Sequence, residues 1–235
     1  MPGSSDGRVR DISDLLSRLG LRRPTSAQEL PAASSSDFEE PAYPSKALKK
    51  FIACLSTRPA PVLIDLGPVV GSNIAFFGEQ LGCKIYVEDL CADLERHERE
   101  GTLDQFPELL KSRFRQDDES VDGVLCWDVF DHLDQASARA VATELTRVIR
   151  PNGALLGFFR TIAVGAAHYT RYVVVDAENL RHRPYGTARG RQGVLQNRDI
   201  IKLFAGLRVS DSFLLQSNVR EILFRRPEYL SFGGR

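Results

Sequence analysis

The sequence contains few of the residues that mark specialised classes of protein. Its 235 residues include one Met, one Trp and four Cys. The cysteines form no CxxC pair, and most have apolar neighbours; they are Cys54, Cys83, Cys91 and Cys126. We therefore expect buried, reduced thiols, with neither disulfides nor a metal site.

Charge of one sign is not in excess, since 31 Lys and Arg residues match 31 Asp and Glu residues. An extended nucleic-acid track or an anionic membrane surface is therefore not the expected partner. No apolar run approaches the roughly 20 residues of a membrane span, and the N-terminus lacks the apolar centre of a signal peptide. We expect a cytoplasmic protein that acts on a small molecule, of unknown oligomeric state.

The chain is long enough for one sizeable core, but its first part differs from the rest. Residues 1–45 are rich in Pro, Ser and Ala after a short amphipathic pattern, which places Ile12, Leu15, Leu16 and Leu19 on one helical face. We expect a mobile N-terminal arm with a short helix, which is either a disordered tail or a segment that docks on a partner or covers the site. Residues 46–235 are expected to form one domain.

Strand-like and helix-like segments alternate from residue 46 onward. Helices are expected at 46–55, 72–82, 93–100, 136–149 and 197–207, and strands at 62–66, 84–89, 121–130 and 151–159. In the second helix, Ile74, Phe77 and Leu81 form the expected apolar face. The alternation predicts a doubly wound, mostly parallel α/β sheet with helices on both faces. Two alternating runs, 208–216 and 219–227, predict an antiparallel C-terminal hairpin.

A glycine-bearing turn follows the first of these strands, in the stretch "PVLIDLGPVVGSN" at 61–73. Asp65 ends the strand, and Gly67 and Gly71 lie where the backbone must turn or be approached closely. In an open parallel sheet, ligands bind beyond the carboxyl ends of the strands. Glu88 ends the next strand, 23 residues after Asp65, where a carboxylate can accept hydrogen bonds from ribose hydroxyls; Asp89 is the competing candidate.

Several segments between residues 46 and 227 resemble the motifs of class I S-adenosylmethionine-dependent methyltransferases. "VLIDLGPVVGS" resembles the first motif, "YVED" the second, "ESVDGVLCWDVFDHL" the fourth strand with its loop, and "LTRVIRPNGALLGFF" the helix, turn and fifth strand. The resemblance implies a Rossmann-like fold and S-adenosylmethionine as the cofactor. It also implies a set of cofactor-binding residues, namely Asp65, Gly67, Val70, Gly71, Glu88 and Trp127.

Two departures from the family pattern affect the cofactor site. Val69 stands where many members have a third glycine, and Pro68 restricts Gly67 to extended conformations. Backbone N–H groups of Val70 and Gly71 remain available, so we expect a reshaped binding site. Residues 101–120 show no convincing third strand, and Asp104 and Asp117 are poor candidates for contact with an adenine.

The loop "CWDVFDHL" supplies the candidate catalytic residues beyond a strand end. Asp128 is expected to line the pocket, and His132 could remove a proton from an oxygen or nitrogen acceptor, because imidazole exchanges protons near neutral pH. The alternative is that Asp131 caps the following helix and that His132 is a surface residue. Trp127 either packs in the core or covers a sulfonium cation.

An Arg-rich insertion is expected at about 165–198, with arginines and glycines interspersed on a flexible segment. The arginines from Arg181 onward are Arg181, Arg183, Arg189, Arg191 and Arg198. They either bind an anionic acceptor through bidentate contacts or belong to a solvated loop. RNA is a weaker interpretation, because Tyr185 is the aromatic residue available there for base stacking.

The sequence thus predicts a methyltransferase acting on an unidentified, anionic small molecule. A catalytically inactive binding or scaffolding protein of the same fold is the alternative, supported by Val69 and by the missing strand. A dehydrogenase is disfavoured, since the turn lacks full GxGxxG spacing.

Overall fold

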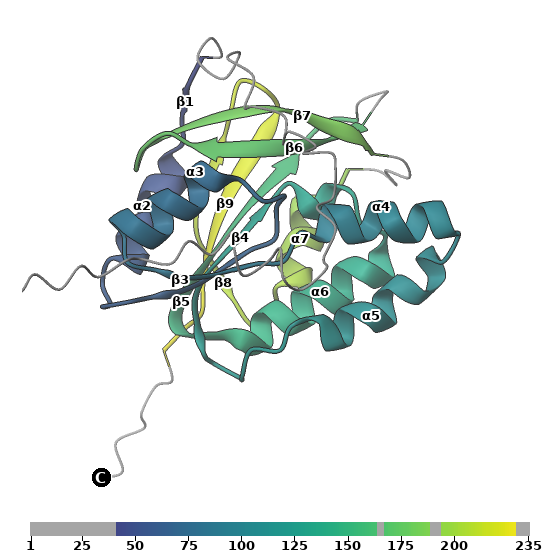
Figure 1. The fold of residues 1–235 in the computed structure, drawn as a ribbon, viewed down its shortest axis with the longest axis horizontal. Helices are drawn as coiled ribbons and strands as arrows, with labels where there is room; N and C mark the ends of the chain where they lie inside the picture. Colours follow the sequence, from purple (N-terminus) through teal and green to yellow (C-terminus); the bar gives the residue numbers. More distant parts are fainter. Residues whose placement is uncertain (1–40, 164–166, 189–193, 229–235) are drawn as a thin grey trace, which may run out of the picture. The chain divides into compact units, whose positions relative to one another are not determined.

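The computed structural model describes residues 41–163, 167–188 and 194–228. Its main sheet has six strands in the order β3-β2-β4-β5-β9-β8 (Figure 1). The strands are β2 (Val62–Asp65), β3 (Lys84–Val87), β4 (Val121–Trp127), β5 (Ile149–Arg160), β8 (Arg208–Leu214) and β9 (Val219–Arg225). The first four in sheet order are parallel, whereas β9 pairs antiparallel with both β5 and β8. The predicted fold class, including the antiparallel C-terminal hairpin, is confirmed.

Helices cover both faces of this sheet (Figure 1). On one side lie α2 (Lys46–Leu55) and α3 (Gly71–Ile74); on the other lie α4 (Leu90–Glu100), α5 (Phe106–Arg113), α6 (Gln135–Val148) and α7 (Asn197–Leu203). Each side has its own apolar core, and every residue of the central strand β4 is buried between them. Near-continuous burial is typical of a strand covered on both faces. The sheet therefore leaves its carboxyl edge as the place for a ligand.

The predicted second helix begins at Gly71 but changes period. After α3 the chain forms a π-helical turn, Ala75–Gln80 (η2), which buries Phe76 and Phe77 and leaves Ile74 41% exposed. The expected apolar face with Ile74 is therefore wrong. A π-helical turn spaces its hydrogen bonds over five residues, so the 3.6-residue period no longer selects the buried side chains.

Residues 88–120 contain no strand. Between β3 and β4 the chain forms α4, the short turn Leu103–Gln105 (η3) and α5. The expected absence of a third strand is confirmed, and β3 is the end strand of the sheet. Asp104 lies in η3, and Asp117 lies in the loop between α5 and β4, near the amino end of β4 and not at the carboxyl end of a strand.

A second, three-stranded sheet extends over the carboxyl edge of the main one (Figure 1). It has the order β1-β7-β6, where β1 is Tyr43–Pro44, β6 is Ala167–Val174 and β7 is Asn179–Ala188. The expectation of a flexible segment from Arg181 onward is therefore wrong as far as Ala188, because these residues form a strand that pairs antiparallel with β6. Arg189 and Arg191 lie outside the described residues. So does most of the expected N-terminal arm, whose last residues form β1 and the cap of α2.

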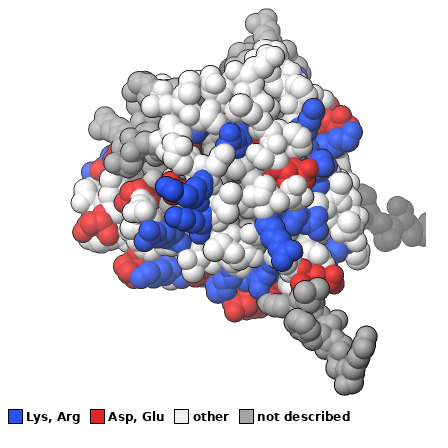
Figure 2. Space-filling view, turned by 180° about the vertical axis from the view of Figure 1, so that it is seen from behind, with Lys and Arg blue, Asp and Glu red and all other residues white. Residues whose placement is uncertain are grey.

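The described surface mixes charges of both signs. Figure 2 shows Lys and Arg interspersed with Asp and Glu over the face seen from behind. Within the described ranges, no helix combines the length and the apolar character that crossing a membrane requires. All four cysteines are free thiols. Cys83, Cys91 and Cys126 are buried, as expected, whereas the expected burial of Cys54 is wrong, because it is partly exposed.

Candidate functional site

Asp65 closes β2 at the carboxyl edge and is buried. Its Oδ1 accepts a hydrogen bond from the backbone N–H of Gly67 at 2.9 Å and from the indole N–H of Trp127 at 2.7 Å. Burial raises the pKa of Asp65 to about 6; the two hydrogen bonds oppose that rise, and the charge of Asp89 adds to it. This carboxylate therefore links the glycine turn to the end of β4.

The two glycines of the turn have different surroundings. A Cβ atom at Gly67 would lie 2.7 Å from Cδ1 of Trp127, so only glycine lets the indole approach the backbone. A Cβ atom at Gly71 would meet nothing within 4 Å. Val69 is 60% exposed and has no positive φ, so its branched side chain imposes no backbone strain. The turn is thus closed at Gly67 and open from Val69 to Gly71.

Trp127 is the most constrained residue at this edge. Its φ of 47° lies in the left-handed region, which is rare for a bulky residue and is often found at functional sites. Its ring stacks on Tyr172 of β6, with centroids 5.0 Å apart and planes at 9°, and meets the edge of Phe158 at 5.7 Å. In this structure Trp127 is a packing residue, and its indole fills the space beside Gly67.

Glu88 directly follows β3, and its Oε2 forms an ion pair with Nη1 of Arg113 on α5. Arg113 also donates from Nε to Asp93 at 3.0 Å. Asp89 caps α4, since its Oδ1 accepts from the backbone N–H of Ala92 at 3.0 Å. The competing candidate Asp89 therefore has a structural role. Glu88 would have to replace or share its ion pair with Arg113 in order to accept hydrogen bonds from a ribose.

Asp128 and His132 lie together beyond β4, and both are buried. His132 Nε2 is 3.6 Å from Asp128 Oδ2, too far for a hydrogen bond. In the described part of the chain, neither this oxygen nor either ring nitrogen has a hydrogen-bond partner. A surface position for His132 is therefore wrong. The 3₁₀ turn Val129–Asp131 (η4) folds the chain back before His132. The centroid of the His132 ring lies 4.6 Å from that of the Tyr169 ring on β6.

Asp131 does not cap the next helix, contrary to the expectation. Its Oδ2 accepts from the backbone N–H of Arg160 at 2.9 Å, while Asp134 caps α6 by accepting from Ser137 at 2.7 Å. Burial raises the pKa of Asp131 to about 6, although the hydrogen bond from Arg160 lowers it. The guanidinium of Arg160 also lies near two carboxylates: its Nη2 is 3.8 Å from Asp128 Oδ2, and its Nε is 3.8 Å from Asp131 Oδ2.

The structure brings the sequence-predicted residues to one edge of the sheet in adjacent groups. Asp65, Gly67 and Trp127 are in contact. Asp128 directly follows Trp127 in the chain, and the turn Val129–Asp131 brings His132 close to Asp128. The sequence interpretation missed residues that now border these groups, namely Arg113, Arg160, Tyr169 and Tyr172. Arg160 could have been found, because it ends the strand beside β4. The others lie on helices or strands that sequence alone does not place there.

A cavity of about 720 Å³ lies elsewhere, between α6 and α7. Its wall includes Ala138, Leu195 and Leu203, and none of the predicted site residues borders it. Among the described residues, the buried polar atoms of Asp128 and His132 without hydrogen-bond partners lie instead at the carboxyl edge, whereas those of Gln116 and Arg150 lie at the amino end of the sheet. We therefore place the candidate chemistry at that edge, where the sheet topology also favours it.

Residues 64–157 match the family model described as a methyltransferase domain. The matched segment runs from β2 to β5 and includes the glycine turn, Glu88, Trp127, Asp128 and His132. This part of the chain is a class I methyltransferase domain. Such a domain implies methyltransferase activity that depends on S-adenosylmethionine. The family match does not identify the acceptor.

Solved structures are similar only at the level of fold. The Burkholderia thailandensis 1,6-didemethyltoxoflavin-N1-methyltransferase, with 1,6-didemethyltoxoflavin and S-adenosylhomocysteine bound, is 17% identical over 78% of this chain and 79% of its own, with a TM-score of 0.44. A putative type 11 methyltransferase from Sulfolobus solfataricus is 18% identical over 74% and 87%, at 0.40. A TehB-like methyltransferase from Corynebacterium glutamicum is 12% identical over 77% and 89%, at 0.45. No curated protein matches. These likenesses are too weak to transfer a substrate or a residue's role.

Proposed function

We propose that this protein transfers a methyl group from S-adenosylmethionine to an oxygen or nitrogen atom of a small molecule bound at the carboxyl edge of the sheet. One observation carries the proposal. Asp128 and His132 form a buried pair shortly after Trp127 in the matched domain, and Asp128 Oδ2 and both imidazole nitrogens lack hydrogen-bond partners among the residues that the structure describes. Native proteins rarely leave buried polar atoms unpaired, so such a pair indicates a ligand or water.

The residues proposed to hold the cofactor are Asp65, Gly67, Val70, Gly71, Glu88 and Trp127. They fit it at one end, because the open space at Gly71 lets a ligand approach the backbone, and both carboxylates can accept hydrogen bonds. At the other end the indole lies against Gly67, and Arg113 holds Glu88. Cofactor binding would therefore exchange these protein contacts for ligand contacts.

When bound, S-adenosylmethionine would supply a methyl group on a positively charged sulfur: the lone pair of the acceptor atom forms a bond to the methyl carbon, and the sulfur keeps the electron pair of the broken C–S bond. His132 is proposed to take the proton that the acceptor atom loses. Asp128 would fix the orientation of the imidazole and stabilise it once it is charged. The two side chains also position the acceptor, which supplies much of the acceleration of such a transfer.

The single tryptophan of the chain provides a direct binding test. Trp127 stacks on Tyr172 and donates to Asp65, so its fluorescence should change when S-adenosylmethionine or S-adenosylhomocysteine enters. We expect saturable quenching or a spectral shift with both ligands, and the same with His132→Gln, which should keep binding and lose turnover. If neither ligand changes the emission or gives heat in a calorimetric titration at millimolar concentration, the cofactor assignment is wrong.

A second candidate is a binding protein of the same fold that has lost catalysis. It is favoured by the protein contacts that now satisfy Asp65 and Glu88 and by the indole beside Gly67. The two candidates differ in a simple way. A wild-type protein that binds the cofactor but methylates no acceptor, with the same background as His132→Gln, would support the second.

A further inference from the structure

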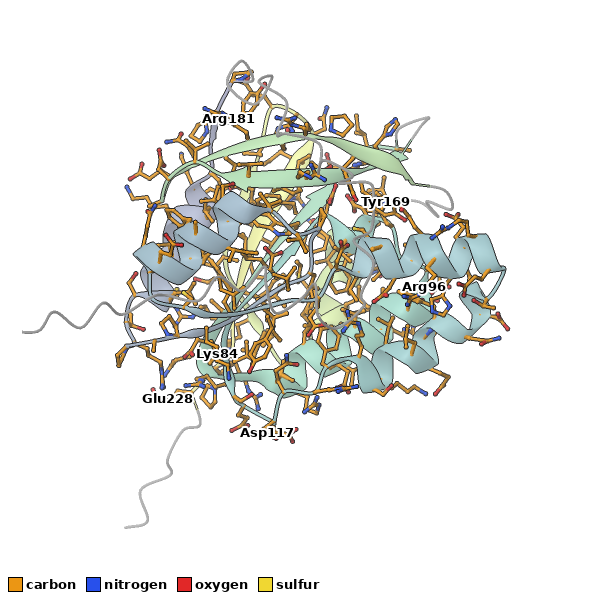
Figure 3. All side chains as sticks on the ribbon, viewed as in Figure 1. Lys84, Arg96, Asp117, Tyr169, Arg181 and Glu228 are labelled. Carbon is orange, nitrogen blue, oxygen red and sulfur yellow. The ribbon has the colours of Figure 1, made fainter. Side chains whose placement is uncertain are left out.

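The β6–β7 hairpin contributes a tyrosine to the edge where the methyl acceptor would bind. Tyr169 is fully buried, and its ring is tilted at 54° against that of His132 at 4.6 Å. In Figure 3, Tyr169 lies between the hairpin and α4. Its hydroxyl has no hydrogen-bond partner among the described residues. Among the described residues, buried polar atoms of Tyr169, His132 and Asp128 thus have no hydrogen-bond partner. Besides His132, Asp128 Oδ2 also lies near the guanidinium of Arg160, whose Nη2 is 3.8 Å away.

These atoms define the chemistry of what they could bind. An ionised Asp128 only accepts hydrogen bonds, a neutral His132 donates one and accepts one, and the Tyr169 hydroxyl does both. Burial also raises the pKa of Tyr169 above its usual range, so the phenol stays protonated and can donate. A hydroxyl or an N–H group satisfies this set, because it donates to the carboxylate or imidazole and accepts from the phenol.

An arginine two residues along the same strand has no carboxylate partner within the described ranges. Arg171 is half-buried, and its Nε is enclosed without a hydrogen-bond partner in the described part of the chain. Its guanidinium lies 4.4 Å from the ring centroid of Tyr185, which pairs directly with Tyr169 across the hairpin. Alternation along a strand puts residues 169 and 171 on one face, about 6.6 Å apart. The guanidinium therefore lies over Tyr185, beside the position where Tyr185 pairs with Tyr169.

A guanidinium that lies over an aromatic ring, with an Nε–H group that has no hydrogen-bond partner among the described residues, is suited to a carboxylate or phosphate. Arg181 does not offer this arrangement, because it lies toward the other end of the hairpin, on β7 directly after the residues that pair with β1 (Figure 3). The anion-binding arginine is thus expected to be Arg171 on β6 and not Arg181.

We propose that Tyr169 and Arg171 form the acceptor-binding part of the site, and that the acceptor is a small molecule with a hydroxyl or amine near a carboxylate or phosphate group. Tyr169 donates to the atom that receives the methyl group, and Arg171 binds the anionic group. This inference rests on the proposed methyl transfer, and it adds the class of acceptor and two residues that select it.

The test uses the full-length protein, S-adenosylmethionine with a labelled methyl group, and pairs of acceptors that differ in charge. The acids are the hydroxybenzoate and aminobenzoate isomers, lactate, glycine and phosphoserine. Each carboxylate is paired with its neutral carboxamide, and phosphoserine with serine. We expect wild type to methylate at least one acid or phosphate, and to prefer it over its partner by about tenfold or more, as a lost charged hydrogen bond implies.

Two variants separate the roles of the residues. Arg171→Gln should raise KM for the anionic acceptor about tenfold with little effect on its neutral partner, whereas Arg208→Gln, an exposed arginine on β8, should change neither. Tyr169→Phe should lower kcat for the acceptor about tenfold, whereas Tyr185→Phe, which keeps the ring beneath Arg171, should not. Because the Tyr169 hydroxyl has no hydrogen-bond partner among the described residues, Tyr169→Phe should also unfold no earlier than wild type, which a structural role would not predict.

The outcomes distinguish this inference from the proposed function. A failure of S-adenosylmethionine to bind would end the proposed function, and is seen in the tryptophan titration alone. If wild type binds the cofactor yet methylates none of the anionic acceptors, methylates neutral partners equally well, or is unaffected by both Arg171→Gln and Tyr169→Phe, the acceptor inference is overturned.

Discussion

Asp65 combines two roles that conflict electrostatically. Its hydrogen bonds to Gly67 and Trp127 shape the turn, yet burial raises its pKa from 3.8 to about 6. The folded protein therefore binds this proton more tightly than the unfolded chain. Stability contributed by the protonated carboxyl is present below about pH 4 and is lost as the pH rises through about 6. Near neutral pH the folded state carries the cost of a buried charge.

Asp65→Asn should therefore stabilise the protein without cofactor above pH 6. The amide oxygen can still accept from Gly67 and Trp127, while the desolvation cost of the charge disappears. We expect a gain on the order of 1–3 kcal/mol at pH 7.5 that shrinks toward pH 4, in line with a shift of about two pKa units. Urea unfolding at both pH values measures it. A variant that is less stable at pH 7.5 than wild type would show that the carboxylate is needed in its charged form.

At the scale of elements, one side chain joins the glycine-turn helix to the hairpin. Asn73 on α3 is buried, donates from Nδ2 to the carbonyl of Tyr172 at 2.9 Å, and accepts at Oδ1 from the N–H of Val174 at 2.8 Å. Its amide thus pairs with β6 as a neighbouring strand would. The cofactor turn and the element that carries Tyr169 and Arg171 are therefore mechanically connected.

Asn73→Ala should loosen this connection. Two buried backbone groups of β6 would lose their partners, at a cost of about 1–3 kcal/mol. Faster amide hydrogen exchange in β6 and β7 than in β4 is the expected signature, because the hairpin should open before the main sheet. The exposed neighbour Ser72→Ala is the matched control. Unchanged exchange in the hairpin of Asn73→Ala would mean that the aromatic contacts of Tyr172 hold it without this residue.

The elements of the main sheet could be predicted because their local patterns agree with their burial. The helix at 46–55 is α2 as expected, with Ser45 capping it and Leu48, Phe51 and Leu55 buried. The hairpin could not be fully predicted. β7 contains Pro184 and two arginines, which locally favour a loop. It becomes a strand by pairing with β6, while Tyr172 packs on Trp127 and Phe158. Tertiary contacts decide its conformation.

At the scale of the whole molecule, the same distinction applies to the site. Asp65, Glu88, Asp128 and His132 could be assigned to one edge because parallel strands end there together. Tyr169 and Arg171 could not, because they belong to a separate sheet whose position depends on packing. The indole beside Gly67 and the pairing of Glu88 with Arg113 also depend on distant segments. The sequence thus indicates where the ligand binds better than what surrounds it.

Cofactor binding should be measurable as a gain in stability of the whole fold. A ligand that binds only the folded state at about 100 times its Kd adds about 2.7 kcal/mol, which for a chain of this size raises Tm by about 5–10 °C. We expect this shift for wild type with S-adenosylhomocysteine. Gly71→Val should fold normally, because a Cβ atom there meets no protein atom within 4 Å, yet its side chain fills the space proposed for the ligand.

Thermal unfolding of wild type and variant, with and without S-adenosylhomocysteine, tests the assignment of Gly71. The variant should lose the shift and keep nearly the same Tm without ligand. Gly78→Ala is the matched control, since its Cβ atom would meet only Cδ1 of Ile85 at 3.7 Å, away from the turn, and it should keep the full shift. Retention of the full shift in Gly71→Val would mean that the ligand does not approach the backbone at Gly71, and that the cofactor lies elsewhere along the carboxyl edge.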